Sequence, residues 1–291
     1  MTFALAIVLH NSERELAVLL KSIDAHLAVR PQVISADSGS SDDGVEVARA
    51  WGAEVVVMDG NPGYGAANNA ALELVREQVT VLLNPDSLLI DGGIARLAQV
   101  ASERRALVAP KLLNDDRTPQ DSAHPVPGGL DGYLAALTIP RLLPTKLRNR
   151  LQPFRSETPT DVGWAIGACL AAQTSLLRQL GPFDPDDFLF AEDLDLCLRA
   201  RALGIPTIFE PAVSLVHSGG HTSSGKLEQK RFDLQARRRR EVILNQLGQN
   251  ALRRDDRTQA LTFSARAALG RDSARNRMLL TALRGAQNRS S

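Results

Sequence analysis

Strand and helix patterns alternate through the first hundred residues, and this alternation constrains the fold more than any other feature of the chain. Apolar runs typical of buried strands occur at "FALAIVL", "QVISA", "AEVVVM", "VTVLL" and "ALVAP". Helical patterns separate them, at residues 12–27, 42–52, 66–78 and 93–104. Strand–helix–strand order favours parallel pairing with right-handed crossovers. We therefore predict an α/β fold, a mostly parallel twisted sheet with helices on both faces.

Local signals set the expected helix ends. Ser12 precedes the first helical pattern and suits an N-cap, and Asp42 or Asp43 could cap the second. Gly52 ends that second helix.

The alternation of strand and helix patterns is interrupted between residues 114 and 159. This segment holds seven prolines and the cationic run "RLLPTKLRNR". Long excursions in compact domains are often functional, so it is predicted to be a lid or an acceptor-binding insertion. A strand pattern "VGWAIGACLAAQ", a short helix "TSLLRQLG", a helix over 192–203 and a strand "IPTIFEPAVSLVH" follow, and the chain is helical from Leu227.

Charge is divided unevenly along the chain, although the net charge is only +1. Residues 226–291 carry 16 Lys/Arg against 6 Asp/Glu, whereas the first 225 residues carry 18 against 27. A basic tail of this kind could bind an anionic membrane surface or a nucleic acid, and a solvated helical face explains it equally well. Two cysteines are too few for a disulfide framework and favour a reducing compartment. The N-terminus reads as a strand and not as a signal peptide, and no apolar run is long enough to span a membrane.

Polar residues follow the predicted parallel strands, where open sheets bind ligands. His10 and Asn11 close the first strand, and Asp37 closes the second. A glycine-rich loop and a helix start after the third strand supply Gly63, Tyr64, Gly65 and Asn68. The loop nearly matches the dinucleotide fingerprint, but Asn68 stands where its third glycine belongs. This helix start could still meet a phosphate group.

The fourth strand ends in "NPDS", with Asn84 and Asp86 at its edge. A single carboxylate suits Mg²⁺ or Mn²⁺, which leave most of their positions to water and substrate phosphates. A plain β-turn is the alternative. His217 ends the last strand and is a possible further ligand, or a core histidine.

The stretch "DPDDFLFAEDLDLCLRA" mixes carboxylates with large apolar side chains. Asp195 and Arg199 are four apart and are predicted to pair on a helix. Glu192 and Asp193 fall in the first turn of that helix, and one of them is a candidate general base at a cleft wall.

Together these residues resemble the family 2 glycosyltransferases of GT-A fold, and within them a bacterial rhamnosyltransferase-like branch. The matching motifs, in order from Ala4 to Ser223, are "LHNS", "ADSGSSDDG", "GNPGYGAANNAA", "LLNPDS", the block from "GACLAAQ" to "RALGI", and "PAVSLVHSGGHTS". Asn84 departs from the first Asp of the family's D-x-D element, and Ser38 and Phe190 replace its usual Asn and Tyr.

The resemblance implies an inverting transfer of a sugar, L-rhamnose from dTDP-rhamnose, to a hydroxyl of a saccharide acceptor, polyprenyl-diphosphate-linked, in cell-envelope polysaccharide synthesis. A UDP- or GDP-sugar donor is the alternative. It implies a divalent metal, Mg²⁺ or Mn²⁺, on Asp86 and His217, and donor contacts from the strand-end and glycine-loop residues, which are His10, Asn11, Asp37, Gly63, Tyr64, Gly65, Asn68, Asn84 and Asp86. Asp193 is the implied general base, with Glu192, Trp164 and Gly167 on the acceptor side.

The implied organisation is a catalytic domain over residues 1–225 and a basic helical extension over 226–291. Within the former, 1–113 form a nucleotide-sugar-binding half, 114–160 a variable loop or lid, and 161–225 an acceptor-side half. A cytoplasmic location is expected, free or on the inner face of the cell membrane through the basic region, and no nucleic acid partner is expected.

Three other classes fit less well. Sugar nucleotidyltransferases and NAD-dependent Rossmann enzymes both need a glycine-rich first turn, where this chain reads "HNSEREL". A non-catalytic membrane- or nucleic-acid-binding protein leaves Asp37, Asp86 and Asp193 unexplained.

Overall fold

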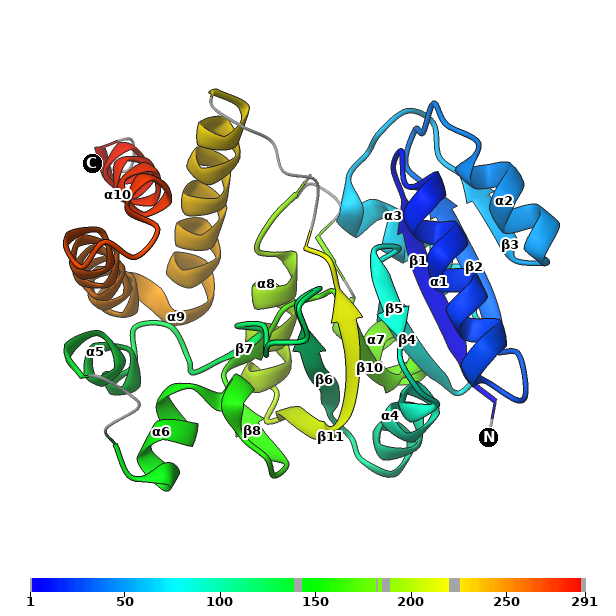
Figure 1. Cartoon of the computed structure of the whole chain (residues 1–291), viewed down its shortest axis with the longest axis horizontal. Coiled ribbons are helices and arrows are strands. Elements are labelled where there is room, and N and C mark those ends of the chain that lie inside the picture. The colour runs from blue at the N-terminus through cyan, green and yellow to red at the C-terminus, as the bar shows by residue number, and fades with distance from the viewer. Residues whose placement is uncertain (1, 139–142, 182, 185–188, 220–225, 289–291) are drawn as a thin grey trace. The chain divides into compact units, whose positions relative to one another are not determined.

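A computed structural model describes residues 2–138, 143–181, 183–184, 189–219 and 226–288. The chain divides into two compact units (Figure 1). The first consists of Met1–Ala123 with Phe154–Gly220, and the second of His124–Pro153 with His221–Ser291, as far as these ranges are described.

A nine-stranded mixed sheet forms the first unit, in the order β3-β2-β1-β4-β10-β6-β11-β5, with β8 paired to β11. Strands β1 to β4 run parallel, β6 and β11 are parallel to each other, and β10 runs antiparallel between β4 and β6. The predicted α/β architecture is confirmed. The strands are β1 (Ala4–Leu9), β2 (Gln32–Asp37), β3 (Glu54–Val57), β4 (Val79–Leu83), β5 (Ser87–Leu89), β6 (Leu107–Leu113), β8 (Thr160–Val162), β10 (Cys169–Gln173) and β11 (Thr207–His217).

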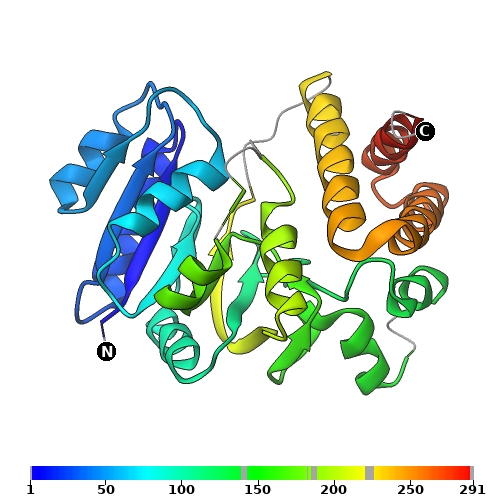
Figure 2. The same cartoon turned by 180° about the vertical axis from the view of Figure 1, so that it is seen from behind.

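Both faces of the sheet are buried, because alternate side chains of each central strand point to opposite sides. In β1 the residues Leu5, Ile7 and Leu9 pack into one core with α1 and α4, while Ala4, Ala6 and Val8 pack into the other with α3, α7 and α8 (Figures 1 and 2). The helices are α1 (Glu13–His26), α2 (Gly44–Trp51), α3 (Tyr64–Glu73), α4 (Gly93–Glu103), α7 (Thr174–Leu180) and α8 (Glu192–Ala202).

Helix ends follow the predictions in part, since α3 runs from Tyr64 to Glu73 where residues 66–78 were predicted. Gly52 ends α2 in the left-handed conformation, with φ 101°. Ser12 occupies the N-cap position of α1 as predicted, but its hydroxyl bonds to the backbone of His10 and makes no side-chain cap bond to the helix. The carboxylate of Asp42 accepts the free N–H of Glu13 at 2.8 Å instead, and also the N–H of Gly44 in α2 at 3.3 Å.

The segment expected to be a long irregular excursion contains regular structure. It holds β7 (Ala123–His124), α5 (Leu130–Leu137), α6 (Thr145–Leu151) and a 3₁₀ turn (Pro153–Arg155), and β7 pairs with β9 (Trp164–Ala165). The prolines and glycines fall mostly between these short elements, which explains why the sequence pattern looked irregular.

Helices α5 and α6 belong to the second unit together with α9 (Lys226–Ala268) and α10 (Ser273–Asn288). Gly248, with φ 80°, breaks α9 into two helical halves. Arg239 and Asp255 join these halves through a two-pronged ion pair, and Arg240 pairs with Asp256 beside it. Within the described parts of the chain, no helix is at once long and apolar enough to cross a membrane.

The predicted domain boundary differs from this division. The prediction kept residues 114–160 in the catalytic domain and began the extension at residue 226, whereas 124–153 pack with the C-terminal helices. Which segments are needed for function stays a prediction.

Candidate active site

The turn after β4 and the end of β11 meet at the carboxyl edge of the sheet. Asn84, Pro85 and Asp86 form the predicted turn, closed by the N–H of Ser87 donating to the carbonyl of Asn84 at 3.2 Å. Strand β5 continues from this turn and pairs antiparallel with the end of β11, with Ser87 opposite His217. This pairing brings His217 beside Asp86 across more than a hundred residues.

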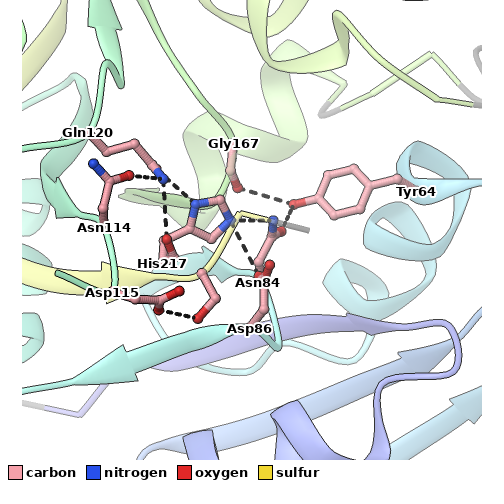
Figure 3. Close-up of polar contacts among 9 residues, drawn as sticks. Tyr64, Asn84, Asp86, Asn114, Asp115, Gln120, Gly167 and His217 are labelled. Carbon is pink, nitrogen blue, oxygen red and sulfur yellow. Dashed lines mark hydrogen bonds and ion pairs between the residues drawn. The ribbon is translucent and has the colours of Figure 1, made fainter. Parts of the chain in front are cut away.

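The imidazole of His217 faces the carboxylate of Asp86 (Figure 3). Nε2 of His217 lies 3.3 Å from Oδ1 of Asp86, and the two side chains are only 10% and 16% exposed. The side-chain amide nitrogen of Asn84 lies 3.5 Å from the same Nε2.

Gln120 fixes the orientation of this imidazole, and sequence reasoning did not find it. Its amide nitrogen donates to the carbonyl of His217 and to Oδ1 of Asn114, both at 3.2 Å. Its amide oxygen therefore faces Nδ1 of His217, at 2.9 Å, and accepts a hydrogen bond from the N–H there (Figure 3). In the neutral ring this leaves the lone pair of Nε2 directed at Asp86.

Nε2 of His217, which carries this lone pair, lies 3.3 Å from Oδ1 of Asp86. Two such atoms are suited to bind the same cation. Two ligands about 2.1 Å from an octahedral ion, and at right angles, stand about 3 Å apart. No group of three or more His, Cys, Asp or Glu that could hold a metal occurs among the described residues. The donor pair fits Mg²⁺ or Mn²⁺, which accept few protein ligands and keep positions for phosphate oxygens.

Tyr64 connects this pair to the acidic helix. It lies in the first turn of α3, and its hydroxyl is 3.0 Å from Oδ1 of Asn84 and 3.1 Å from the carbonyl of Gly167. Burial raises the pKa of Tyr64 above its usual range, and the negative charges of Glu192, Asp193 and Asp86 raise it further. Three predicted site carboxylates therefore act on the ionisation of one phenol.

Asp193 is held at the start of α8 by two backbone groups. The N–H of Gly167 donates to its Oδ2 at 2.8 Å, and the N–H of Leu194 donates to its Oδ1 at 2.7 Å. A Cβ on Gly167 would stand 3.2 Å from Cβ of Asp193, so a glycine permits this approach. Phe190 and Ala191 precede the helix with φ 75° and 66°, a conformation that L-residues rarely adopt.

The leucines of this stretch and its Asp195–Arg199 pair stabilise α8 itself. Leu194, Leu196 and Leu198 are buried, and Asp195 pairs with Arg199 at 2.6 Å as predicted. Phe188 lies outside the described residues. Glu192 and Trp164 are partly buried, and Trp164 packs against the core under α8.

The ends of β1 and β2 form a second cluster. Asp37 is 3% exposed and accepts the N–H of Ser40 at 3.3 Å, and Asn11 accepts the N–H and hydroxyl of Ser41 at 2.8 and 3.0 Å. Nδ1 of His10 lies 2.8 Å from the carbonyl of Ser38.

Asn61 joins the two clusters and was also missed by sequence reasoning. Its Oδ1 accepts the hydroxyl of Ser38 at 2.8 Å and the N–H of Gly63 at 3.2 Å, next to Tyr64. Gly63 has φ 99° and Gly65 is buried. Asn68 is 1% exposed and its Nδ2 donates to the carbonyl of Tyr64, so it supports the helix start from inside.

The sequence matches the family profile "Glycosyl transferase family 2" over residues 5–160. The chain is 29% identical over 211 residues to an N-acetylglucosaminyl-diphospho-decaprenol L-rhamnosyltransferase of Mycobacterium tuberculosis, covering 66% of this chain and 67% of the relative. It is 25% identical over 224 residues to the rhamnosyltransferase WbbL of Escherichia coli, covering 74% and 83%.

A solved structure shares the fold. It is the mannosyltransferase PcManGT of Pyrobaculum calidifontis in complex with GDP-Man and Mn²⁺, with a TM-score of 0.61 and 17% identity, covering 98% of this chain and 85% of that one. This likeness confirms the predicted GT-A fold.

Proposed function

Since the chain belongs to glycosyl transferase family 2 and is a glycosyltransferase, we propose that it moves a sugar from a nucleotide-diphospho-sugar to a saccharide hydroxyl with inversion. One observation carries the proposal: the Asp86–His217 pair and Asp193 belong to one polar cluster at the carboxyl edge of the sheet, linked through Asn84, Tyr64 and Gly167.

Asp86 and His217 are the proposed ligands of a Mg²⁺ or Mn²⁺ ion. When bound there, the ion neutralises charge on the departing nucleoside diphosphate. Donor contacts near that position are proposed for Asn84, Gly63, Tyr64, Gly65 and Asn68. A pocket for the nucleoside is proposed at His10, Asn11 and Asp37.

Asp193 is the proposed general base. As the acceptor oxygen bonds to the anomeric carbon, the bond from that carbon to the diphosphate oxygen breaks, and the hydroxyl proton passes to the Asp193 carboxylate. Backbone donors from Gly167 and Leu194 hold this carboxylate in place. Glu192, Trp164 and Gly167 are proposed to line the acceptor side.

The proposed donor is dTDP-rhamnose and the proposed acceptor a polyprenyl-diphosphate-linked saccharide in cell-envelope synthesis, because two relatives are rhamnosyltransferases and the name of one includes a decaprenol-linked sugar. A GDP- or UDP-sugar is the alternative donor, and the mannosyltransferase complex with GDP-Man gives it support. Residues 1–225 are proposed as catalytic, and the basic extension 226–291 as contact with the inner face of the membrane.

The test is the thermal midpoint with dTDP, UDP and GDP, each with and without Mg²⁺ or Mn²⁺. A ligand at about a hundred times its dissociation constant adds roughly 2.7 kcal/mol, which shifts the midpoint by several degrees. We expect a metal-dependent shift with dTDP that disappears in Asp86→Ala. A metal-dependent shift with GDP or UDP instead would replace the donor, and no shift with any nucleotide would refute the site.

A further inference from the structure

Helix α5 exposes an apolar face that nothing among the described residues covers. Leu130, Leu134 and Leu137 are 75%, 42% and 71% exposed, and the helix contains no buried residue. Their spacing, at positions i, i+4 and i+7, puts all three on one side of the helix. Isolated exposed leucines are ordinary, but three on one short helix form a patch.

The opposite side of α5 docks on the second half of α9. A Cβ on Gly132 would meet the methyl group of Thr258 at 3.2 Å, and a Cβ on Gly128 would stand 2.3 Å from the carbonyl of Ala251. Nε of Arg254 donates to the carbonyl of Gly128 at 2.7 Å. The helix is thus anchored to α9 through its glycine side, and the leucines lie on the opposite side of α5. Figure 1 shows α5 beside α9.

The unit that carries this face is strongly basic. Residues 124–153 and 221–291 together hold 20 Lys/Arg and 7 Asp/Glu, a net charge of +13, whereas the rest of the chain holds 14 and 26, a net charge of −12. The charge asymmetry that the sequence placed in the tail therefore includes the segment with α5 and α6.

The conspicuous run Arg237–Arg240 is not the cationic surface, because it is used within the unit. Arg238 pairs with Glu241 at 2.8 Å, Arg239 with Asp255, and Arg240 with Asp256. Arg237 is exposed and lies 3.8 Å from Glu241, and further exposed cations lie elsewhere. Arg253 and Arg257 share an outer stripe of α9 with Leu261, which is 45% exposed, and Lys146 is exposed on α6 beside α5.

We propose that the leucine face of α5 (Leu130, Leu134, Leu137) inserts into the interfacial layer of an anionic lipid bilayer, with Lys146 of the neighbouring α6 on its headgroups and the net positive charge of the unit drawing it to the surface. This inference extends the proposed function, in which the acceptor is lipid-linked, and it moves the membrane contact from the tail alone to α5. A bilayer offers apolar and anionic groups together, as this surface requires. Two copies of the unit would instead bring like charges together.

The experiment is co-sedimentation of the full chain with vesicles of phosphatidylcholine and phosphatidylglycerol in equal parts, and with vesicles of phosphatidylcholine alone. We expect binding to the mixed vesicles, weakened about tenfold or more in Leu130→Asp/Leu137→Asp. Lys146→Gln should weaken it roughly fivefold. The matched control is Val18→Asp/Val29→Asp, at positions 51% and 68% exposed in the acidic unit, and it should bind as the wild type does.

Equal binding of the leucine variant and the wild type would overturn the proposal, and so would failure of the wild type to bind. A change from dimer to monomer in the leucine variant, seen by size-exclusion chromatography, would assign the face to a second copy and also overturn it. Each protein is first checked for the metal-dependent shift with nucleotide. A wild type that shows the nucleotide shift but does not bind the mixed vesicles falsifies only the membrane face, and absence of the shift in a wild type that binds them falsifies only the transferase site.

Discussion

Gln120 is the residue whose role is least visible in the sequence. Its amide group donates two hydrogen bonds and accepts one, and these determine which ring nitrogen of His217 presents its lone pair to Asp86. Partners of this kind orient a ligating histidine and commonly change metal affinity by about 10- to 100-fold when removed. Gln120 is thus a positioning residue of the proposed metal site.

Gln120→Leu should weaken the affinity for Mn²⁺, measured by calorimetry in the presence of the nucleotide, by about tenfold or more. Gln120→Glu should retain more of the affinity, because a carboxylate oxygen can still accept from Nδ1. The control is Gln99→Leu, an exposed glutamine on α4 that bonds only to the same helix. A Gln120→Leu protein with lower thermal stability but unchanged Mn²⁺ affinity would limit this residue to a structural role.

Tyr64 gives a prediction about alkaline pH. The pKa of Tyr64 is raised in the folded protein by burial and by three carboxylates, whereas a tyrosine in the unfolded chain has a pKa near 10. Above about pH 10 the folded state holds the proton that the unfolded state releases, so stability falls as pH rises, by about 1.4 kcal/mol per unit. In Tyr64→Phe this fall should be shallower. Urea unfolding at pH 9 and 11, without metal or nucleotide, compares the two slopes, and identical slopes would contradict the assignment.

At the scale of elements, one carboxylate holds the starts of two helices. Asp42 accepts the N–H of Glu13 in α1 and of Gly44 in α2, whereas Asp43, at the N-cap position of α2, makes no side-chain cap bond. Asp42→Ala should therefore lower the free energy of unfolding by about 1 kcal/mol, and Asp43→Ala by a few tenths. Equilibrium urea unfolding of the two neighbours measures the difference. A larger loss in Asp43→Ala would show that the helix dipole, and not these bonds, dominates.

Most helices and strands of the unit that contains the sheet could be predicted, because the sequence patterns that mark them are local. Apolar strands, helical periodicity and Gly52 or Gly181 at helix ends gave the order from β1 to α8. The carboxyl edge could be predicted as well, since parallel strands end together and polar residues follow them. The roles of Asn61 and Gln120 could not be predicted, because each acts through contacts that only the tertiary fold creates. An amide side chain in an irregular segment has no sequence pattern that marks it as functional.

In the whole molecule, the two units carry net charges of opposite sign. The unit of the sheet has a net charge of −12 and the helical unit +13. Sequence reading assigned the basic excess to the tail and missed the inserted residues 124–153, because only packing against α9 shows that the two segments form one body. The prolines and glycines of that segment concealed α5 and α6.

This division predicts which deletion the fold tolerates. Removing residues 221–291 alone leaves α5 without Ala251, Arg254 and Thr258, its docking partners. Removing 124–153 as well, with a short glycine–serine linker, keeps the sheet unit whole, since Ala123 and Phe154 lie in one buried cluster. We expect the double deletion to stay monomeric in size-exclusion chromatography and to unfold cooperatively, and the single deletion to aggregate. The opposite ranking would show that 124–153 belongs to the catalytic unit, as the sequence suggested.

The central claim is that this glycosyltransferase uses Asp193 as its base, and the most direct measurement is the single-turnover rate of sugar transfer in Asp193→Asn and Asp195→Asn. The two carboxylates are two residues apart on α8, but only Asp193 lies at Gly167, while Asp195 pairs with Arg199. We predict a rate lower by about 10²- to 10⁴-fold in Asp193→Asn with unchanged donor affinity, and a near wild-type rate in Asp195→Asn. Equal rates in the two variants would contradict the account.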